Sequence, residues 1–337
     1  MSPGHNQEVL QRKHTMRERC ICIWMNIHPV LSMSEYIRSP LIRIMYEKLE
    51  HQNKHLNSDH NHWYEYHPEY MENEFRDKFI RCKQDEETST FLENCFVKSD
   101  WLLTHFCHAI AKAVLTWFMT STSINGLLGR GSMFVFSSAQ FLRLLNVNDN
   151  FKFDYLLDLG AGDGNVTMKM APFFNNVYVT EISPVMRWRL SKHGFTVLDV
   201  DSWDSPNKEW NSQKVPSHFD VISCLNLLDR CIAPITLLKR ISRALKPITG
   251  VLILGIVLPL KQYVETTTDK RPNELLAITD SDQWEVQLSS LIKNILIPAN
   301  YEVIRWTRLP YLCEGDFSRS FYSLNDIVLV LRNSITE

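Results

Sequence analysis

The sequence predicts an α/β fold built on a doubly wound, mostly parallel sheet. Two observations lead to this prediction. From Phe153 to the C-terminus, short apolar runs alternate with segments of helical pattern, which is typical of a parallel sheet that helices cover on both faces. The glycine-rich turn GAGDG at 160–164 directly follows the first apolar run, and open α/β sheets bind their ligands at such strand ends.

The expected elements follow the chain in order. Seven strands are expected at 155–159, 177–181, 195–199, 219–225, 250–258, 301–307 and 326–331, with helices near 165–172, 184–192, 234–245 and 283–299. Upstream, apolar side chains at helical spacing between Trp101 and Trp117 indicate a helical extension. We therefore expect a polar, His-rich segment (1–75), a helical cap or lid region (76–149) and an α/β domain (150–337).

Charge and hydropathy exclude two classes of function. Lys and Arg number 36 and Asp and Glu 38, for a formal net charge of −2, so we expect no nucleic-acid partner. No apolar run reaches the roughly 18 residues that a membrane span needs. A basic stretch precedes the apolar CICIWMNIHPVLS at 20–32, but Asn26 and His28 interrupt it, so it indicates a signal or anchor only weakly.

The glycine-rich turn points to the chemistry of its ligand. The chain has 11 glycines, and Gly160, Gly162 and Gly164 fall within five residues. The turn matches neither the P-loop pattern nor the spacing of a dinucleotide site. Asp158 and Asp163 would repel a pyrophosphate, whereas they suit a ligand with a cationic end. S-adenosylmethionine is such a ligand, because it carries a sulfonium, an ammonium and a ribose.

Two further acids follow the next strands. Glu181 closes the second strand, where a carboxylate accepts hydrogen bonds from ribose hydroxyls. Asp201, after the third strand, is expected near the adenine amino group, with Trp203 or Ile182 against the ring. The alternative is that Asp158 and Glu181 only cap turns.

Four longer strings resemble a known family. INGLLGRGSMFVFS (124–137), LLDLGAGDG (156–164), SCLNLLDR (223–230) and TRLPYLCEGD (307–316) are similar to strings of the DREV-type methyltransferases, the protein-histidine N-pros methyltransferases. The resemblance runs from about Ile37 to the C-terminus. It implies a Rossmann-like class I methyltransferase that uses S-adenosylmethionine and releases S-adenosylhomocysteine. It also implies methyl transfer to Nπ of histidine in H-x-H segments of other proteins, and association with endomembranes or mitochondria, which leaves the compartment open.

The resemblance also assigns site residues. It places Asp158, Gly160 and Gly162 in the cofactor loop and Glu181 at the ribose. It makes Asn226 and Asp229 the substrate-side pair, with Asn226 also near the cofactor, and Tyr322 a contact of the substrate. The family has Asn-Glu-Trp where this chain has Asp201, Ser202 and Trp203, and it has a tyrosine where this chain has Phe321.

The residues agree with this chemistry. A histidine methylated at Nπ must carry its proton on Nτ. We expect Asp229 to accept that Nτ–H, Asn226 to orient the ring or the cofactor, and Tyr322 to add a hydroxyl contact. The alternatives are a helix cap or an ion pair with Arg230 or Lys239 for Asp229, a turn for Asn226 and core packing for Tyr322. A neutral imidazole, with a pKa of about 6.5, needs no strong base.

Three features leave more than one interpretation open. Arg130, in LLGRGSMFVF, belongs either to a lid that reaches the ligand carboxylate or a loop acid, or to a connector. Glu314 and Asp316 either bound a substrate channel or form a solvated turn. The histidines at 51–67 form a solvated polar segment, a metal site, or a self-methylation target at His60 or His62, which make an H-x-H. The alternative function is methylation of another protein side chain or of a small molecule.

Overall fold

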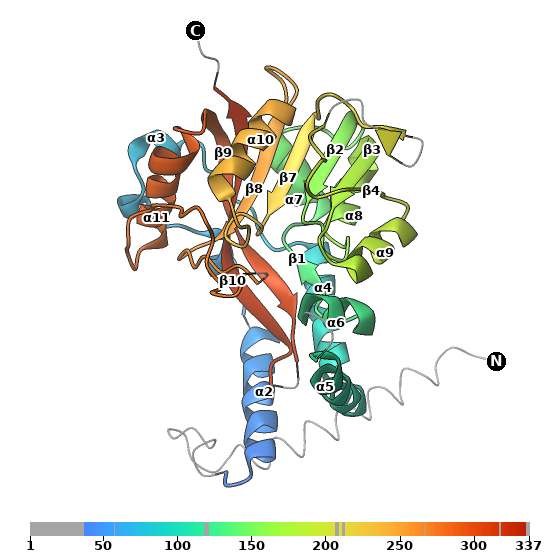
Figure 1. Cartoon of the computed structure of the whole chain (residues 1–337). Helices are drawn as coiled ribbons and strands as arrows, with labels where there is room; N and C mark the ends of the chain where they lie inside the picture. Colours follow the sequence, from blue (N-terminus) through green and yellow to red (C-terminus); the bar gives the residue numbers. More distant parts are fainter. Residues whose placement is uncertain are drawn as a thin grey trace, which may run out of the picture. The chain divides into compact units, whose positions relative to one another are not determined.

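An eight-stranded mixed sheet organises the part of the chain that this computed structural model describes, residues 37–56, 58–117, 121–205, 209–210, 213–265, 267–316 and 318–334. The order is β1-β9-β10-β8-β7-β2-β3-β4 (Figure 1). The strands are β1 (Met133–Phe134), β2 (Phe153–Leu159), β3 (Phe174–Thr180), β4 (Thr196–Leu198), β7 (Val221–Leu225), β8 (Val251–Val257), β9 (Tyr301–Glu314) and β10 (Phe321–Asn333). A separate pair, β5 (Glu209–Trp210) and β6 (Gln213–Lys214), is antiparallel.

The sheet confirms the expected α/β alternation and corrects its details. Strands β4, β3, β2, β7 and β8 are parallel. The β9–β10 hairpin is antiparallel, and β10 also runs antiparallel to β8. All seven expected strands are present, but the expectation of a seven-stranded, mostly parallel sheet is wrong. The eighth strand, β1, pairs with the extended end of β9, and two residues are too short to give a periodic pattern.

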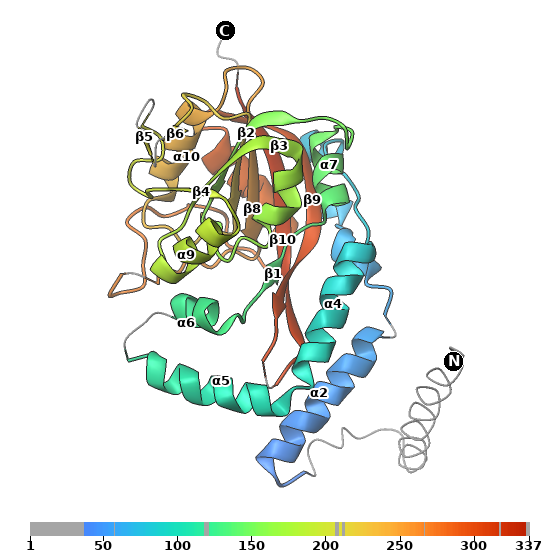
Figure 2. The same cartoon turned by 90° about the vertical axis from the view of Figure 1, so that its right-hand side faces the viewer.

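Helices cover both faces of the sheet (Figure 2). On one face α10 (Pro234–Ala244) and α11 (Trp284–Leu291), continued by a π-helical turn (Ile292–Leu296), share a core with alternate residues of β2, β7, β8 and β10. On the other face α4 (Glu86–Ser99) and α7 (Ser138–Leu145) pack on the intervening residues. This alternation follows from the twofold side-chain period of a strand.

The order of the strands defines where a ligand site belongs. Strand β2 lies between β3 and β7, so the chain leaves β2 toward one side of the sheet and returns on the other. The carboxyl ends of β2 and β7 flank this switch point, which is where doubly wound sheets bind ligands. The short α8 (Thr167–Met170) follows the glycine-rich turn, and α9 (Pro184–Lys192) follows β3.

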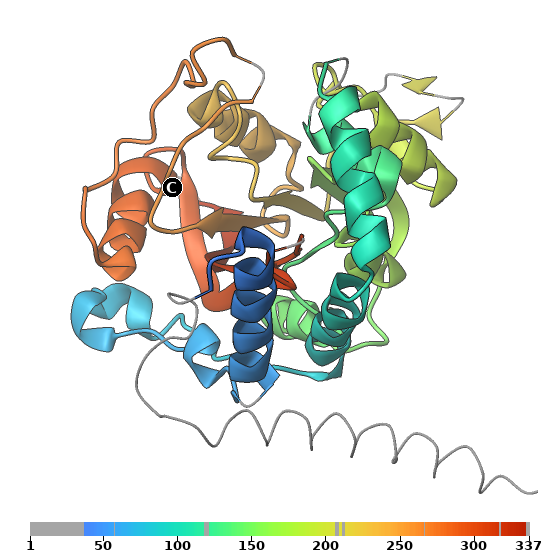
Figure 3. The ribbon, with the colours of Figure 1, turned by 90° about the horizontal axis from the view of Figure 1, so that it is seen from below.

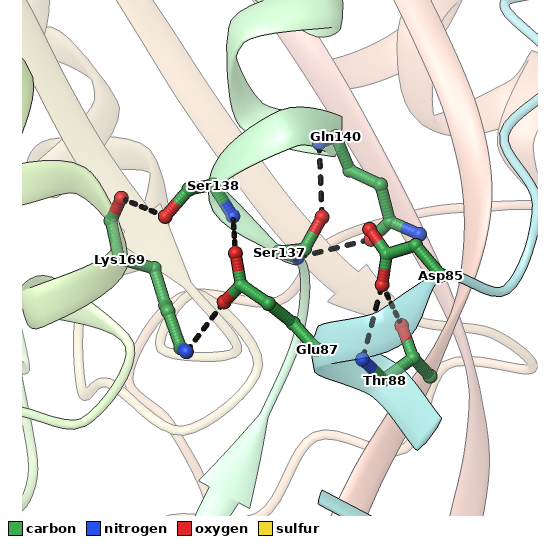
Figure 4. Close-up of polar contacts among 7 residues, drawn as sticks. All are labelled: Asp85, Glu87, Thr88, Ser137, Ser138, Gln140 and Lys169. Carbon is green, nitrogen blue, oxygen red and sulfur yellow. Dashed lines mark hydrogen bonds and ion pairs between the residues drawn. The ribbon is translucent and has the colours of Figure 1, made fainter. Parts of the chain in front are cut away.

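Two capped helices support this region from one face of the sheet. Asp85 accepts hydrogen bonds from the backbone N–H and the hydroxyl of Thr88 at 3.0 and 2.7 Å, which caps α4. Ser137 and Gln140 form a reciprocal capping box at the start of α7, with both bonds 3.0 Å long (Figure 4). Such caps satisfy N–H groups that a helix leaves unpaired, and each is worth about 1 kcal/mol.

A carboxylate joins these helices to α8. Glu87, in the first turn of α4, accepts the backbone N–H of Ser138 at 3.1 Å and pairs with Lys169 of α8. The Ser138 hydroxyl in turn donates to the carbonyl of Lys169 at 3.0 Å (Figure 4). The element that follows the glycine-rich turn is therefore held by side chains from α4 and α7.

The N-terminal part differs from the expectation of a polar segment with little periodicity. A helix, α2 (Pro40–Leu56), occupies part of it (blue in Figure 3). Trp63, Tyr64 and Phe75 are buried in the cores of the unit His51–Glu337. The expected helix near 101–117 is α5 (Leu102–Leu115), followed by α6 (Ser121–Leu128). The stretch 20–32 lies outside the described residues, and among the described helices none is long and apolar enough to span a membrane.

Candidate functional site

The glycine-rich turn has a backbone that only glycine adopts without strain. Gly160, Gly162 and Gly164 all have positive φ values, of 71°, 57° and 84°. A Cβ on Gly164 would lie 2.9 Å from Leu190 Cδ2, and one on Gly160 would lie 3.2 Å from the side chain of Leu227. The turn after β2 therefore lies directly against the segment that follows β7.

Glu181 fixes the turn from the neighbouring strand. It follows β3 directly, is buried, and accepts the N–H of Gly162 at 3.1 Å on Oε2 and the N–H of Ser183 at 2.8 Å on Oε1. Each carboxylate oxygen can accept a second hydrogen bond. The structure thus places Glu181 where the sequence predicts it, at the edge of the turn, and its ribose contact stays a prediction.

Asp158 lies beneath the turn. Its Oδ2 accepts the hydroxyl of Thr167 at 2.6 Å and its Oδ1 the hydroxyl of Ser223 at 2.7 Å. Burial raises the pKa of Asp158 to about 6, although the two hydroxyl bonds lower it. This carboxylate ties β2 to α8 and β7, so its first effect is to hold the turn, and direct contact with a ligand stays a prediction.

At the expected adenine side, one of the two residues predicted to contact the adenine ring is buried. Asp201 is exposed in the turn after β4. Trp203 is buried, and the Arg240 guanidinium stacks on its ring at 4.9 Å, while Arg240 also donates to the Asp201 carbonyl at 3.0 Å. Of the two apolar candidates for a ring contact, Ile182 is the exposed one, at 64%.

Asn226 immediately follows β7 and is held in an uncommon conformation. Its φ is 52°, and its N–H donates to the carbonyl of Gly255 at 2.9 Å. Its Nδ2 donates to Oδ2 of Asp326 at 3.0 Å. Its Oδ1 is buried and has no hydrogen-bond partner within the described residues. The expected turn role and a ligand-facing oxygen therefore coexist in this residue.

Asp229 lies three residues further on, with its side chain also buried. Its Oδ2 lies 3.7 Å from Nε of Arg230, and its Oδ1 is without a hydrogen-bond partner in the part of the chain that the structure describes. Burial raises the pKa of Asp229, and the Arg230 charge offsets part of this rise. The helix-cap alternative is wrong, because α10 begins at Pro234 with Ala233 at its cap. The ion pair with Arg230 is present.

Asp326, in β10, is a member of this group that the sequence analysis missed. It is fully buried, and while Oδ2 binds Asn226, Oδ1 has no hydrogen-bond partner among the described residues. Burial, with a smaller contribution from the nearby Asp229, raises the pKa of Asp326 to about 7, although the hydrogen bond from Asn226 lowers it. The one sequence signal was an acid that opens an otherwise apolar strand, DIVLVL.

Together, Asn226, Asp229 and Asp326 form a group of hydrogen-bond acceptors without matching donors among the residues that the structure describes. Asn226, Asp229 and Asp326 each carry one buried oxygen with no hydrogen-bond partner in the described structure. Buried acceptors are rarely unpaired, because each costs about 1–3 kcal/mol. A ligand with N–H groups, or with positive charge, would satisfy them.

The β9–β10 hairpin carries Tyr322. Its hydroxyl donates to Oδ2 of Asp316 at 3.0 Å and lies 3.3 Å from the Ser318 hydroxyl. Its register partner on β9 is Cys313. The structure thus joins Tyr322 to Asp316, and the expected contact of Tyr322 with a substrate stays a prediction.

Arg130 and Glu314 are partners of each other. Arg130 Nε lies 3.1 Å from Oε1 of Glu314, and its Nη2 donates to the Gly315 carbonyl at 2.9 Å. Glu314 is buried, so the solvated-turn interpretation is wrong for it, although Asp316 is exposed. Arg130 thus reaches an acid at the end of β9, and its expected contact with the ligand carboxylate stays a prediction. Ser132 contacts the residue that follows the glycine-rich turn, because its hydroxyl accepts Nδ2 of Asn165 at 2.9 Å.

The histidine-rich segment is packed in part, so the interpretation as a solvated segment is wrong for His51, His55 and His60 and holds for the exposed His62 and His67. His60 is buried, with Nε2 3.0 Å from Nδ1 of His55 and Nδ1 3.0 Å from Oε1 of Gln84. Its ring stacks on Trp63. Burial and neighbouring histidines lower the pKa of His55 to about 4. Within the described residues no group of His, Cys, Asp and Glu is arranged to hold a metal ion. His62 is exposed.

Comparison with known proteins identifies a family match. A family model described as DREV methyltransferase matches residues 63–333, a range that contains the glycine-rich turn, Asn226, Asp229 and Asp326.

Solved structures give a weaker likeness. The N-methyltransferase NodS from Bradyrhizobium japonicum WM9, in complex with S-adenosyl-L-homocysteine, is 16% identical, with 58% of this chain and 85% of that chain covered and a TM-score of 0.36. A putative methyltransferase from Bacillus halodurans C-125 is 14% identical, with 59% and 100% covered and a TM-score of 0.38. The CurJ carbon methyltransferase is 14% identical, with 75% and 73% covered and a TM-score of 0.42. At TM-scores this low, the likeness carries no functional argument.

Proposed function

Because the chain belongs to the DREV methyltransferase family, we propose that it transfers a methyl group from S-adenosylmethionine to histidine side chains of other proteins. The methylated nitrogen is Nπ, and the acceptor histidine lies in an H-x-H segment with a small central residue. The observation that carries this proposal is the group of three buried oxygens, on Asn226, Asp229 and Asp326, that have no hydrogen-bond donor among the described residues.

The residues around the glycine-rich turn fit the methyl donor. Gly160 and Gly162 have positive φ values and no Cβ, so a ligand can approach the backbone of the turn closely. Glu181 keeps lone pairs for two ribose hydroxyls beyond the N–H groups that it already accepts. Asp201 and Ile182 are exposed at the expected adenine side. S-adenosylmethionine, when bound, supplies the electrophilic methyl carbon.

Asp229 selects the reactive form of the acceptor. A neutral imidazole that donates Nτ–H to Oδ1 of Asp229 keeps its lone pair on Nπ. The ring becomes cationic as that lone pair bonds the methyl carbon and the methyl–sulfur bond breaks. A buried carboxylate beside the ring stabilises this charge until Nτ releases its proton to water. Burial, which raises the pKa of Asp229, also makes the carboxylate gain more from an N–H donor than it would in water.

The test is methyl transfer from labelled S-adenosylmethionine to the peptide Ala-His-Gly-His. Wild type is compared with Asp229→Asn. Glu302→Gln is the control, because Glu302 pairs with Arg332 at the end of β10 opposite to Asp326. Transfer to Nπ that falls about 100-fold in Asp229→Asn and stays within about twofold in the control supports the proposal. Transfer to Nτ contradicts the proposed position of the methyl group. No transfer, while calorimetry shows that the cofactor binds, contradicts histidine as the acceptor and favours another side chain or a small molecule.

Of the two candidate targets of self-methylation, His60 and His62, we propose only His62. Nδ1 of His60, which is its Nπ atom, is buried against Gln84, so we expect no methyl group there in the folded protein. His62 is exposed. Peptide mapping of the protein made with and without the change Gly160→Arg tests this: a methyl group on His62 that needs an intact turn supports self-methylation, and its absence contradicts it.

A further inference from the structure

Asn226 is fixed at three points, and the third is a buried acid. The left-handed φ of 52° and the N–H bond to Gly255 at 2.9 Å set its backbone. The bond from Nδ2 to Oδ2 of Asp326 at 3.0 Å sets its side chain. Asparagine adopts the left-handed region more readily than most residues, so this backbone is compatible with a simple turn. The buried side-chain bond to Asp326 goes beyond what a turn requires, because it fixes the orientation of the amide.

The chemistry of the partner determines which end of the amide faces the site. An amide carries a donor on one side and an acceptor on the other, whereas an ionised carboxylate only accepts. With Asp326 ionised, Nδ2 is therefore the atom of Asn226 that faces β10, and Oδ1 is left on the other side of the amide. That oxygen is the buried atom without a partner in the described structure, as is Oδ1 of Asp229.

We propose that Asp326 is a positioning residue for methyl transfer, which acts through Asn226 and directs Asn226 Oδ1 to the acceptor ring, where it shares with Oδ1 of Asp229 the single Nτ–H in a three-centre hydrogen bond. This inference rests on the proposed function for the identity of the acceptor. It adds Asp326, one hundred positions from Asn226, to the three substrate-side residues that the family resemblance implies, Asn226, Asp229 and Tyr322.

A purely structural role accounts less well for Asp326. Its Oδ1 has no hydrogen-bond partner in the described residues, and the nearby Asp229 carries charge of the same sign. A carboxylate in this situation weakens the folded state. Glu285 is equally buried and also leaves one oxygen, Oε2, without a partner in the described residues, but the charge near it is the Arg308 cation rather than a second acid. It therefore serves as a control for the loss of a buried carboxylate.

The experiment compares four full-length proteins with the same peptide: wild type, Asp326→Asn, the exchanged pair Asn226→Asp with Asp326→Asn, and Glu285→Gln. In Asp326→Asn the two amides can pair in either direction, so the orientation is lost. We expect kcat to fall about 10- to 100-fold while KM for S-adenosylmethionine stays within about twofold. In the exchanged pair, the new acid at 226 accepts from the new amide at 326 and keeps an acceptor oxygen toward the site. We expect it to regain at least about a third of the wild-type kcat.

A second measurement does not depend on activity. The side-chain amide signal of Asn226 in a ¹H–¹⁵N spectrum, identified by its loss in the exchanged pair, should be slow to exchange with solvent in wild type and change in Asp326→Asn but not in Glu285→Gln. A kcat in Asp326→Asn within about twofold of wild type overturns the inference. Failure of the folded exchanged pair to regain activity also overturns it. A wild type that leaves the peptide unmethylated contradicts the proposed function, and the amide signal then decides the pairing by itself.

Discussion

Asp326→Asn should make the folded protein more stable at neutral and alkaline pH while it makes the enzyme slower. The carboxyl of Asp326 is fully buried, and burial raises its pKa from 3.8 to about 7. In the unfolded chain the same group ionises near its ordinary pKa. Between pH 4 and pH 7 the folded state therefore binds a proton that the unfolded state has released, and the free energy of unfolding falls as pH rises through this window.

The size of the effect follows from the shift. One pKa unit corresponds to about 1.4 kcal/mol, so ionised Asp326 costs the folded protein at most about 4 kcal/mol above pH 7. Asparagine has the same shape and no charge. The gain in stability of Asp326→Asn over wild type should thus rise from near zero at about pH 4 to a few kcal/mol at about pH 8.

Urea unfolding at several pH values measures this difference. Glu285→Gln neutralises another fully buried acid. Its effect on the free energy of unfolding shows how much the loss of any buried carboxylate contributes. A difference between Asp326→Asn and wild type that does not vary with pH would refute the reasoning. So would a variant that is less stable than wild type at about pH 8, because the ionised carboxylate would then be stabilised by groups that the structure does not place there.

Three further substitutions and one control test the glycine-rich turn, its contact with Glu181 and the ion pair at the end of β9. Gly160→Ala should weaken binding of S-adenosylmethionine at least about tenfold, because its φ of 71° strains any residue with a Cβ, whereas Gly194→Ala, with equal strain and open space around it, should not. Arg130→Ala should lower the free energy of unfolding by about 3 kcal/mol, because it leaves the Glu314 carboxylate buried without its closest cation. Glu181→Gln should weaken cofactor binding about tenfold, because an amide can accept only one of the two N–H groups that the carboxylate holds.

Calorimetry measures the cofactor affinity of the glycine and Glu181 variants, and urea unfolding measures the stability of the Arg130 variant. Equal cofactor affinity of the two alanine variants at glycine positions would contradict the role given to the turn. For the ion pair, Glu314→Gln added to Arg130→Ala should recover most of the lost stability, since a neutral amide costs less to bury unpaired. A double variant no more stable than Arg130→Ala would contradict that role. Unchanged affinity in Glu181→Gln would mean that the ribose and the turn do not depend on this carboxylate.

The sequence predicted the features that are local in the chain. The glycine-rich turn, the strand that precedes it and helix α9 at Pro184–Lys192 each occupy a continuous stretch with its own pattern. By contrast, Asn226 and Asp326 are brought together only because β10 lies beside β8, and nothing in either stretch encodes that neighbour. The pair of Arg130 and Glu314 has the same origin, since it depends on how far β9 extends.

Composition gives the wrong expectation for the buried histidines. Polar residues dominate 51–62, and polarity alone favours a solvated segment. In the structure His55 and His60 share one hydrogen bond, and His60 stacks on Trp63 at 4.0 Å. Phe321, which stands where the family resemblance expects a tyrosine, packs on the His55 ring at 4.7 Å. Neutral imidazoles are amphipathic, so stacking lets them bury surface that a residue-by-residue polarity count assigns to solvent.

The negative charge of ionised Asp326 explains both its destabilising effect on the folded protein and its proposed role in holding the Asn226 amide. A serine, an asparagine or a protonated acid at 326 can donate as well as accept, and each would allow the Asn226 amide to turn around. Only a group that cannot donate fixes the amide, and in a protein side chain that means an ionised carboxylate, the group most expensive to bury. Methyl transfer by the wild type should therefore increase with pH as Asp326 ionises near its pKa of about 7. The acceptor imidazole loses its proton in the same range, but that part of the pH profile belongs to the substrate and should persist in Asp326→Asn, whereas the part due to Asp326 should disappear.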